Sequence, residues 1–293
     1  MNRLAPIVLF VYNRPWHTEQ TLIALSKNDL ANQSILYIYS DGSKTNSTKE
    51  EVEKIDEVRK LIRTKQWCKE VHVIEREKNW GLADSIVDGV TEIVNRYGKI
   101  IVLEDDLVTS PCFLKFMNEA LEFYEGEKDI FSITGFSFPQ RFMNFKSTGK
   151  DDIYFNIRPM SWSWATWEKR WEGIDWDLKD FNAFVSNKRK IKKFNTGGTD
   201  LTPMLLSQNR GEIDSWYVRW SYHAIMRNLY TIYPRISFVN NLGHDGSGVH
   251  CGNKENSIYS HHEMNLNSHY NFIKEIKINK KIIPTCQDSC RLK

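Results

Sequence analysis

The chain has 293 residues, of which 41% are hydrophobic and 26% charged, which is the composition of an ordinary soluble globular protein. This length buries a core without disulfides or metals, and the composition excludes a collagen, a disordered chain, a disulfide scaffold and a membrane bundle. The formal net charge of +3 is too small for the dense basic face that nucleic-acid binding requires, so we expect no nucleic-acid partner.

The Trp content is high, with ten indoles, five of which fall between Trp162 and Trp176. An indole ring needs a wall to pack against and its N–H needs a partner, so a cluster of this size requires an explanation.

The compartment is predicted from the termini and the cysteines. The first apolar run, 7–12, is shorter than a membrane span and lacks the cleavage site of a signal peptide. Five scattered cysteines without a secretion signal predict reduced thiols in a cytoplasm. The Lys- and Ile-rich tail, 273–284, has two interpretations: a solvated terminal segment, which we favour, or peripheral contact with the inner surface of an anionic membrane.

The first hundred residues alternate between the hydrophobic period of strands and that of helices. We expect strands at 5–12, 34–42, 70–77 and 99–106 and helices at 17–28, 48–67 and 82–98. Because the strands are continuously apolar and alternate with helices, they predict a parallel α/β sheet.

The second half is less regular. A helix is expected at 111–125, a strand at 129–136, a Trp-rich segment at 161–176, a helix at 211–229, a strand at 231–239 and a Gly-rich loop at 243–252. We find no repeat and no low-complexity linker, so the sequence predicts one continuous domain.

Polar residues follow three of the predicted strands, at 13–15, 40–42 and 104–106. In parallel α/β sheets ligands bind beyond the carboxyl ends of the strands. The three polar segments therefore predict a binding site at one edge of the sheet.

The segment 104–106 consists of three consecutive carboxylates, Glu104, Asp105 and Asp106. Adjacent carboxylates repel one another unless a cation neutralises them, and Mg²⁺ or Mn²⁺ bound between carboxylates and phosphate oxygens does so. An acidic loop that caps the helix near Pro111 is an equally good interpretation. Since the chain has neither a G-x-x-x-x-G-K-[ST] loop nor a G-x-G-x-x-G motif, the favoured diphosphate ligand is a nucleotide sugar.

The segment IIVLEDDLVTSPCFLKFMNEAL resembles the metal-site segment of glycosyltransferases with the A-type fold. It is most similar to the N-acetylglucosaminyltransferase I group and to bacterial glycan-assembly transferases related to family 2. The segments VYNRP, IYSDG, SWSWATWEKRW, GEIDSWYVRW and GHDGSGVHCG extend the resemblance from Pro6 to Gly252.

The resemblance implies an α/β fold of the glycosyltransferase A type, Rossmann-like, in which helices flank a mixed, mostly parallel sheet. It divides the single domain into a nucleotide-sugar-binding half, 1–110, an acceptor and catalytic half, 111–252, and a C-terminal extension, 253–293.

The resemblance also implies roles for individual residues. Nucleotide-sugar contacts are expected from Arg14, Asp41, Glu104, Asp105, His244, Asp245 and Ser247, and metal contacts from Asp106 and His250. Asn79 and Gly81 lie where related transferases approach the nucleotide, although Asn79 is also placed to cap a helix. Arg14 as a partner of a surface acid and Asp41 as a turn residue stay open as alternatives.

The catalytic base implied by the resemblance is Asp214, with Glu212 as its substitute. In an inverting transfer, a carboxylate takes the proton of the acceptor hydroxyl as that oxygen attacks the anomeric carbon. The family has a second acid where this chain has Ser215, and a diphosphate role for Arg219 is an extrapolation. Asp214 is expected in a partly apolar pocket, and a helix N-cap is its alternative role.

The Trp cluster has two interpretations. Indoles stack on the C–H faces of sugars, and we expect Trp162 or Trp164 to face the donor or the acceptor. Trp164, Trp167 and Trp171 share one face if the segment is helical, which predicts core positions for Trp167 and Trp171.

Together these features predict a metal-dependent inverting glycosyltransferase in the cytoplasm, or peripheral at the cytoplasmic face of the membrane. The expected donor is a UDP-sugar, such as UDP-N-acetylhexosamine, and the expected acceptor is a glycan or lipid-linked glycan of bacterial surface polysaccharide assembly. Retaining chemistry stays open. A non-catalytic carbohydrate-binding protein and a metal-dependent nucleotidyltransferase are the alternatives.

Overall fold

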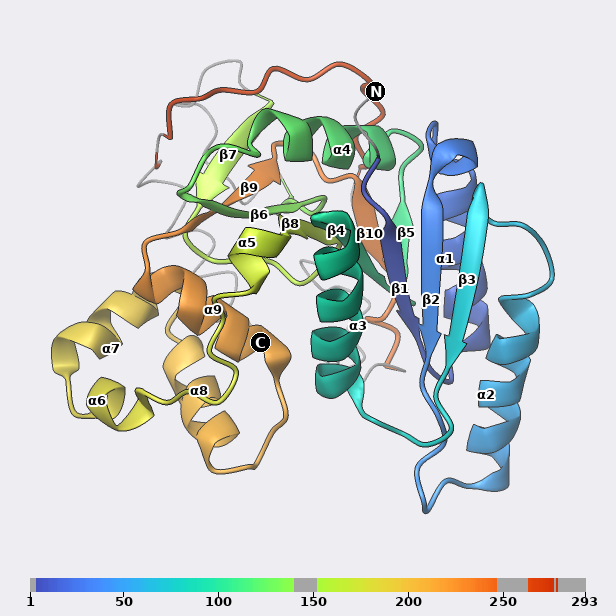
Figure 1. Cartoon of the computed structure of the whole chain (residues 1–293), viewed down its shortest axis with the longest axis horizontal. Helices are drawn as coiled ribbons and strands as arrows, with labels where there is room; N and C mark the ends of the chain where they lie inside the picture. Colours follow the sequence, from blue (N-terminus) through green and yellow to red (C-terminus); the bar gives the residue numbers. More distant parts are fainter. Residues whose placement is uncertain (1–3, 140–151, 247–262, 277, 279–293) are drawn as a thin grey trace.

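The structure is a computed structural model that describes residues 4–139, 152–246, 263–276 and 278. Its main sheet has eight strands in the order β3-β2-β1-β4-β8-β6-β9-β7, and β5 and β10 form a separate antiparallel pair (Figure 1). The strands are β1 (Ile7–Val11), β2 (Ile35–Ser40), β3 (Glu70–Glu75), β4 (Lys99–Glu104), β5 (Leu107–Thr109), β6 (Ile130–Thr134), β7 (Ile153–Asn156), β8 (Trp164–Trp167), β9 (Tyr230–Pro234) and β10 (Val239–Asn241).

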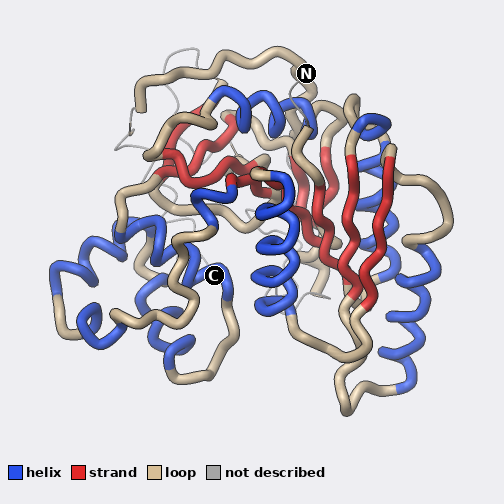
Figure 2. Tube along the Cα trace, viewed as in Figure 1, coloured by secondary structure: helices blue, strands red, loops and turns tan. Residues whose placement is uncertain are grey.

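Helices lie on both faces of the sheet (Figure 2). They are α1 (Pro15–Ser26), α2 (Lys49–Leu61), α3 (Leu82–Tyr97), α4 (Phe113–Phe123), α5 (Glu168–Trp171), α6 (Phe181–Val185), α7 (Lys188–Phe194), α8 (Leu201–Asn209) and α9 (Trp216–Met226). The expected α/β fold with a mixed, mostly parallel sheet flanked by helices is confirmed.

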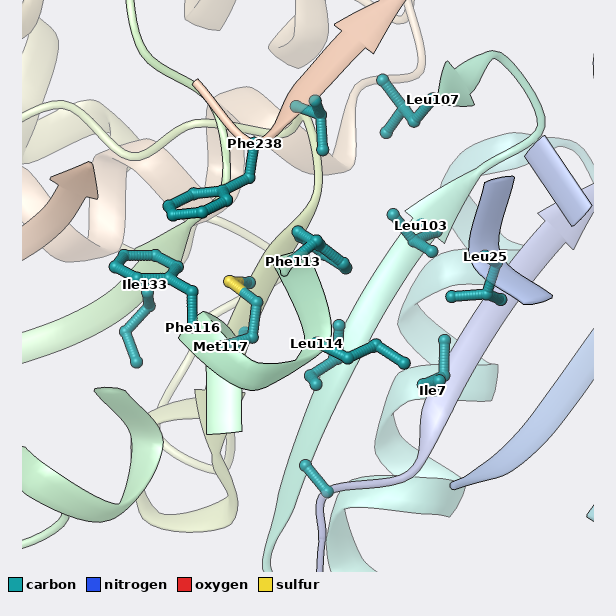
Figure 3. Close-up of a cluster of buried hydrophobic side chains, with 14 of the residues drawn as sticks. Ile7, Leu25, Leu103, Leu107, Phe113, Leu114, Phe116, Met117, Ile133 and Phe238 are labelled. Atoms are coloured by element: carbon teal, nitrogen blue, oxygen red, sulfur yellow. The ribbon is translucent and has the colours of Figure 1, made fainter. Parts of the chain in front are cut away.

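Four adjacent strands, β1 to β4, are parallel, and their side chains alternate between two cores; β6 and β9 form a further parallel pair. Val8 and Phe10 pack with residues of α3 and α9, whereas Ile7 and Leu9 pack with residues of α1, α2 and α4. Figure 3 shows the second of these cores. Because helices cover both faces, the strands are apolar throughout, which is the pattern that the sequence displays.

The helix boundaries follow local signals. Thr48 and Glu51 form a capping box at the start of α2, and Gly98 ends α3 with a φ of 78°.

The Trp segment is not the helix that its spacing suggested. Trp164 to Trp167 form β8, which pairs antiparallel with β4 and with β6, and within 161–176 only the four residues of α5 (Glu168–Trp171) are helical. Because side chains alternate along a strand, Trp164 and Trp167 lie on opposite faces and join different cores. The predicted core positions of Trp167 and Trp171 are confirmed, since both are buried.

Trp164 is the centre of an aromatic stack. Its exposure is 0%, and its ring lies 5.6 Å from Trp171, 5.4 Å from Trp216 and 4.7 Å from Trp220. The expectation that Trp164 faces a sugar is therefore wrong, because its ring is fully buried among three other indoles. Its function is to join α5 and α9 to the sheet.

Replacing Trp164 by Ala is expected to lower the free energy of unfolding by about 3–5 kcal/mol, because the change leaves a large cavity in the core. Urea unfolding measures the effect. Trp16→Ala is the matched control: Trp16 is 56% exposed, and a surface replacement of this kind changes stability by roughly 0.5 kcal/mol or less. Equal losses in the two variants would contradict the structural role of Trp164.

Among the described residues, no helix combines the length and the apolarity needed to cross a bilayer.

Candidate active site

Arg14 connects the ends of β1 and β4. These strands pair in parallel with Phe10 opposite Glu104, so the residues that follow them meet at one edge of the sheet. The Nη2 atom of Arg14 donates to Asp105 Oδ1 and, over 3.0 Å, to Asp106 Oδ2. The polar segments 13–15 and 104–106 therefore lie side by side, and Arg14 pairs with the acidic segment 104–106 itself.

The electrostatics of this group favour a further cation. Burial, together with Asp106 and Asp105, raises the pKa of Glu104 to about 8. Burial opposes the charge of Arg14, but the two aspartates outweigh it and raise the pKa of the guanidinium above its ordinary value. The raised pKa of Glu104 shows that a third negative charge beside Asp105 and Asp106 is unfavourable, so a cation bound at this sheet edge would stabilise the ionised carboxylates.

The acidic segment does not cap the helix that follows it. Cys112 occupies the N-cap position of α4 without a side-chain capping hydrogen bond, the first turn holds no acidic residue, and the N–H of Leu114 donates to Asn28 Oδ1 over 2.9 Å. The alternative interpretation of the triplet as a helix cap is therefore wrong.

A loop from the second half of the chain lies against Asp106. The backbone N–H of Leu242 donates to the carbonyl oxygen of Asp106 over 2.9 Å. A Cβ atom on Gly243 would overlap the Asp106 carboxylate, so a side chain at this position would displace that carboxylate. His17 Nε2 and Asp245 Oδ2 lie 3.0 Å apart and connect the same loop to α1. The loop 242–246 therefore forms a second wall of the acidic site.

The structure places His244 and Asp245 in the loop beside the acidic group, and their contact with a diphosphate stays a prediction. The His244 ring packs edge-on against Trp162, with 5.4 Å between the ring centroids. Trp162 is partly exposed and also packs against Phe136 at 4.7 Å. Of the two indoles expected to face sugar, Trp162 lies beside the loop 242–246, whereas Trp164 is in the core. Ser247 and His250 lie outside the described residues and stay predictions.

Asp41 organises a second group of predicted residues, at the end of β2. Its carboxylate accepts from the backbone N–H groups of Gly42, Trp80 and Gly81 over 2.9, 2.9 and 3.0 Å, and from Asn79 Nδ2 over 2.9 Å. These four donors use the four lone-pair positions of a carboxylate. In this structure Asp41 shapes the loop 79–81; its direct contact with base or ribose stays a prediction.

Asn79 and Gly81 both belong to this loop, and the start of α3 has no side-chain capping hydrogen bond. Asn79 donates a second hydrogen bond to Gly42 O over 3.0 Å, and Gly81 is the N-cap residue of α3 with a φ of 80°. The alternative that Asn79 caps the helix is therefore wrong. A Cβ atom on Gly42 would lie 2.5 Å from the backbone of Lys78, so this turn also requires glycine.

Some residues of the site were missed at the level of sequence. Arg76 directly follows β3, its guanidinium lies 3.5 Å from the Trp80 ring centroid, and it pairs with Asp88 over 2.5 Å. Its position after a parallel strand was a usable signal, since the same rule identified Arg14 and Asp41. His17 and Gly243 carried no such signal, because their roles depend on a contact between distant segments.

The predicted bases lie in the segment before α9. Ser215 is the N-cap of this helix, since its side chain accepts from Val218 N, so the capping alternative for Asp214 is wrong. Asp214 pairs with Arg219 over 3.1 Å, and its side chain is 59% exposed rather than held in an apolar pocket. None of its described contacts is with the acidic triplet.

Glu212 has a different environment. Arg210 donates to both of its carboxylate oxygens, over 2.5 and 2.8 Å, and these hydrogen bonds lower the pKa of Glu212 to about 2. A carboxylate of such low basicity is a poor proton acceptor near neutral pH.

The donor set of the acidic site suits a hard divalent cation. Asp106 Oδ2 is engaged by Arg14, whereas Asp106 Oδ1 has no described hydrogen bond. Within the described ranges, no three His, Cys, Asp or Glu side chains are grouped to bind a metal by themselves. Mg²⁺ and Mn²⁺ do not require such a group, because they are held by one or two carboxylates together with substrate phosphates and water. Asp106, assisted by Asp105, fits that role.

Comparison with known proteins identifies one family. The model of the family described as glycosyl transferase family 2 matches residues 7–204, more than half of the chain. Members of this family commonly use a divalent metal. No curated protein matches the chain significantly.

Several solved structures are similar in part. Mouse xyloside xylosyltransferase 1, in its apo form, is 9% identical, with 77% of this chain and 83% of that chain covered and a TM-score of 0.37. GlyE of Streptococcus pneumoniae TIGR4 is 9% identical, with 80% and 45% covered and a TM-score of 0.35. TarS of S. aureus is 14% identical, with 45% and 21% covered and a TM-score of 0.29. The chain thus spans about a fifth of TarS. Because the TM-scores are low, the assignment to a family rests on the family model alone.

Proposed function

Because the chain belongs to glycosyl transferase family 2, we propose that it transfers a hexosyl or N-acetylhexosaminyl unit from a UDP-sugar to a glycan or lipid-linked glycan. We place this reaction in bacterial surface polysaccharide or glycan assembly, in the cytoplasm or at the cytoplasmic face of the membrane. Family membership disfavours the two alternatives, a carbohydrate-binding protein without activity and a nucleotidyltransferase.

The observation that carries the proposal is the group formed by Arg14, Asp105 and Asp106 beneath the loop 242–246. It offers a basic side chain and carboxylates on one edge of the sheet, with a wall from the second half of the chain. A UDP diphosphate and a divalent cation supply the complementary charges. Arg14 orients both aspartates, and Asp106 Oδ1 makes no hydrogen bond within the described part of the chain.

A bound Mn²⁺ or Mg²⁺ supplies positive charge that stabilises the leaving diphosphate. Asp106 and Asp105 hold this ion in our proposal, and Glu104 lies next to them on β4. Asp41 and Asn79 fix the loop 79–81 at the nucleotide side. Trp162 and His244 border the side on which the donor sugar is placed.

The acceptor side is assigned to Asp214. Its carboxylate precedes α9, is exposed, and is held by Arg219, so it is accessible to an incoming hydroxyl. Asp214 takes the proton of the acceptor hydroxyl, whose oxygen attacks the anomeric carbon from the face opposite the leaving diphosphate, and this displacement inverts the configuration of that carbon. Glu212 is less suitable because of its low basicity.

The test is titration of the full chain with UDP by calorimetry, with and without Mn²⁺, followed by a screen of nucleotide sugars for metal-dependent hydrolysis. We expect UDP binding that Mn²⁺ strengthens and hydrolysis of one UDP-hexose or UDP-N-acetylhexosamine. Absence of UDP binding in both conditions would contradict the proposal. The anomeric configuration of the product, measured by NMR, separates inversion from retention.

A further inference from the structure

The helix α7 carries a dense positive charge at the periphery of the molecule. Its sequence is KRKIKKF, in which five of seven residues are basic. Figure 1 shows α6 and α7 at the far end of the molecule from α2 and β3. Phe194 is buried with Leu201 and Tyr222, and Ile191 packs against the same cluster, so these two apolar residues anchor α7.

The charges of α7 are poorly compensated. Lys190 lies 3.6 Å from Asp180, and Lys193 donates to the carbonyl oxygen of Met226 over 2.8 Å. Lys188, Arg189 and Lys192 are exposed, and none of them makes an ion pair with another residue of the described part.

The spacing within α7 increases the repulsion. Lys188 and Lys192 are four residues apart, as are Arg189 and Lys193, and like charges at this spacing destabilise a helix. On α2, by contrast, the basic residues are matched at the same spacing: Lys49 pairs with Glu53, and Lys54 with Glu50. The α7 face therefore carries uncompensated positive charge, which is complementary to an extended anionic surface.

We propose that the α7 face docks on an anionic phospholipid bilayer. Lys and Arg side chains at a protein surface are attracted to the negative potential of such a leaflet. Val185, at the end of the adjacent α6, is 37% exposed and adds an apolar contact beside the charges. The inference rests on the proposed function in one respect: a lipid-linked acceptor resides at the surface on which α7 docks.

The shape of the patch favours a bilayer over a nucleic acid. α7 is about 10 Å long, whereas nonspecific nucleic-acid binding uses a longer basic groove with aromatic side chains on which bases stack. The exposed indoles of the described chain, Trp16 and Trp80, lie at the start of α1 and before α3, not beside α7.

Docking through α7 also gives an orientation to the acceptor half. α7 contacts the Met226 end of α9, and Asp214 precedes the opposite end of that helix. Eleven helical residues separate the two ends by about 16 Å. A glycan attached to a lipid headgroup spans this distance with a few sugar units, which suits an acceptor that is already partly assembled.

The experiment measures binding of the full chain to vesicles that contain phosphatidylglycerol, with pure phosphatidylcholine vesicles as the neutral control. The test variant is Lys188→Gln/Arg189→Gln/Lys192→Gln. The matched control, Lys49→Gln/Lys54→Gln/Lys69→Gln, removes the same charge from exposed positions outside α7. Circular dichroism and thermal unfolding verify that both variants fold as the parent chain does.

We expect the parent chain to bind the anionic vesicles at low salt, and the α7 variant to bind them roughly a hundredfold less strongly, whereas the control variant changes little. No binding of the parent chain to anionic vesicles, or equal losses in the two variants, would overturn the proposal. So would α7-dependent binding of single-stranded RNA by a chain that ignores vesicles. UDP titration of the same samples separates this result from the proposed function, because vesicle binding requires no nucleotide.

Discussion

Asp106→Asn is expected to abolish the strengthening of UDP binding by Mn²⁺ and to lower the rate of sugar transfer about a thousandfold. The amide keeps the size of the side chain and its hydrogen-bonding oxygen but lacks the negative charge that a divalent cation requires. Metal stabilisation of a leaving diphosphate contributes several kcal/mol, and each 1.4 kcal/mol is a factor of ten in rate. Calorimetry with UDP and a transfer assay measure the two effects.

The matched control for this variant is Asp84→Asn, which makes the same chemical change at an exposed position on α3. We expect the control to keep both properties. The affinity of Asp106→Asn for UDP without Mn²⁺ should change little, because Arg14 remains. If Asp106→Asn retained Mn²⁺-dependent binding, the assignment of the metal ligand would be wrong.

Chain topology at the carboxyl edge of the sheet was predictable because it depends on short-range patterns. Continuous apolar strands alternating with helices allow few arrangements, and parallel neighbours necessarily end at the same edge. The proximity of the segments 13–15 and 104–106 follows from that geometry, whereas the hydrogen bonds of Arg14 to Asp105 and Asp106 are seen only in the structure.

The Trp segment was less predictable, because its hydrophobic period is ambiguous. Indoles at 164, 167 and 171 fit one face of a helix, but Trp164 and Trp167 lie in a central strand that is buried on both sides. A strand covered on both faces has no polar side, so the alternation that identifies a strand is absent. Pairing with β4 and β6, both distant in sequence, determined the outcome.

Local environments could not be predicted either. The four donors of Asp41 come from two segments about 40 residues apart, and the contact of Gly243 with Asp106 crosses more than 130 residues. Sequence spacing identifies the residue types suited to a chemistry. It does not reveal which of their lone pairs the protein itself occupies.

Asp214→Asn is expected to lower the transfer rate by about 10²–10⁴-fold, the contribution of a general base, while UDP binding stays unchanged. The amide preserves the shape of the side chain and loses the basic oxygen. Glu212→Gln is the matched control two residues away: because Arg210 keeps the pKa of Glu212 near 2, this carboxylate accepts protons poorly, and its replacement should change the rate little. A transfer assay and UDP calorimetry on both variants provide the measurements.

The two variants also distinguish catalysis from positioning. Asp214 pairs with Arg219, whose Nε donates to the carbonyl oxygen of Ser215, so loss of the carboxylate charge weakens a contact that holds the start of α9. A purely structural effect would appear equally in Arg219→Gln and would not depend on pH. If Asp214 is the general base, Asp214→Asn removes the increase of the transfer rate with pH, whereas Arg219→Gln keeps that increase. Retention of transfer in Asp214→Asn would move the base to another carboxylate.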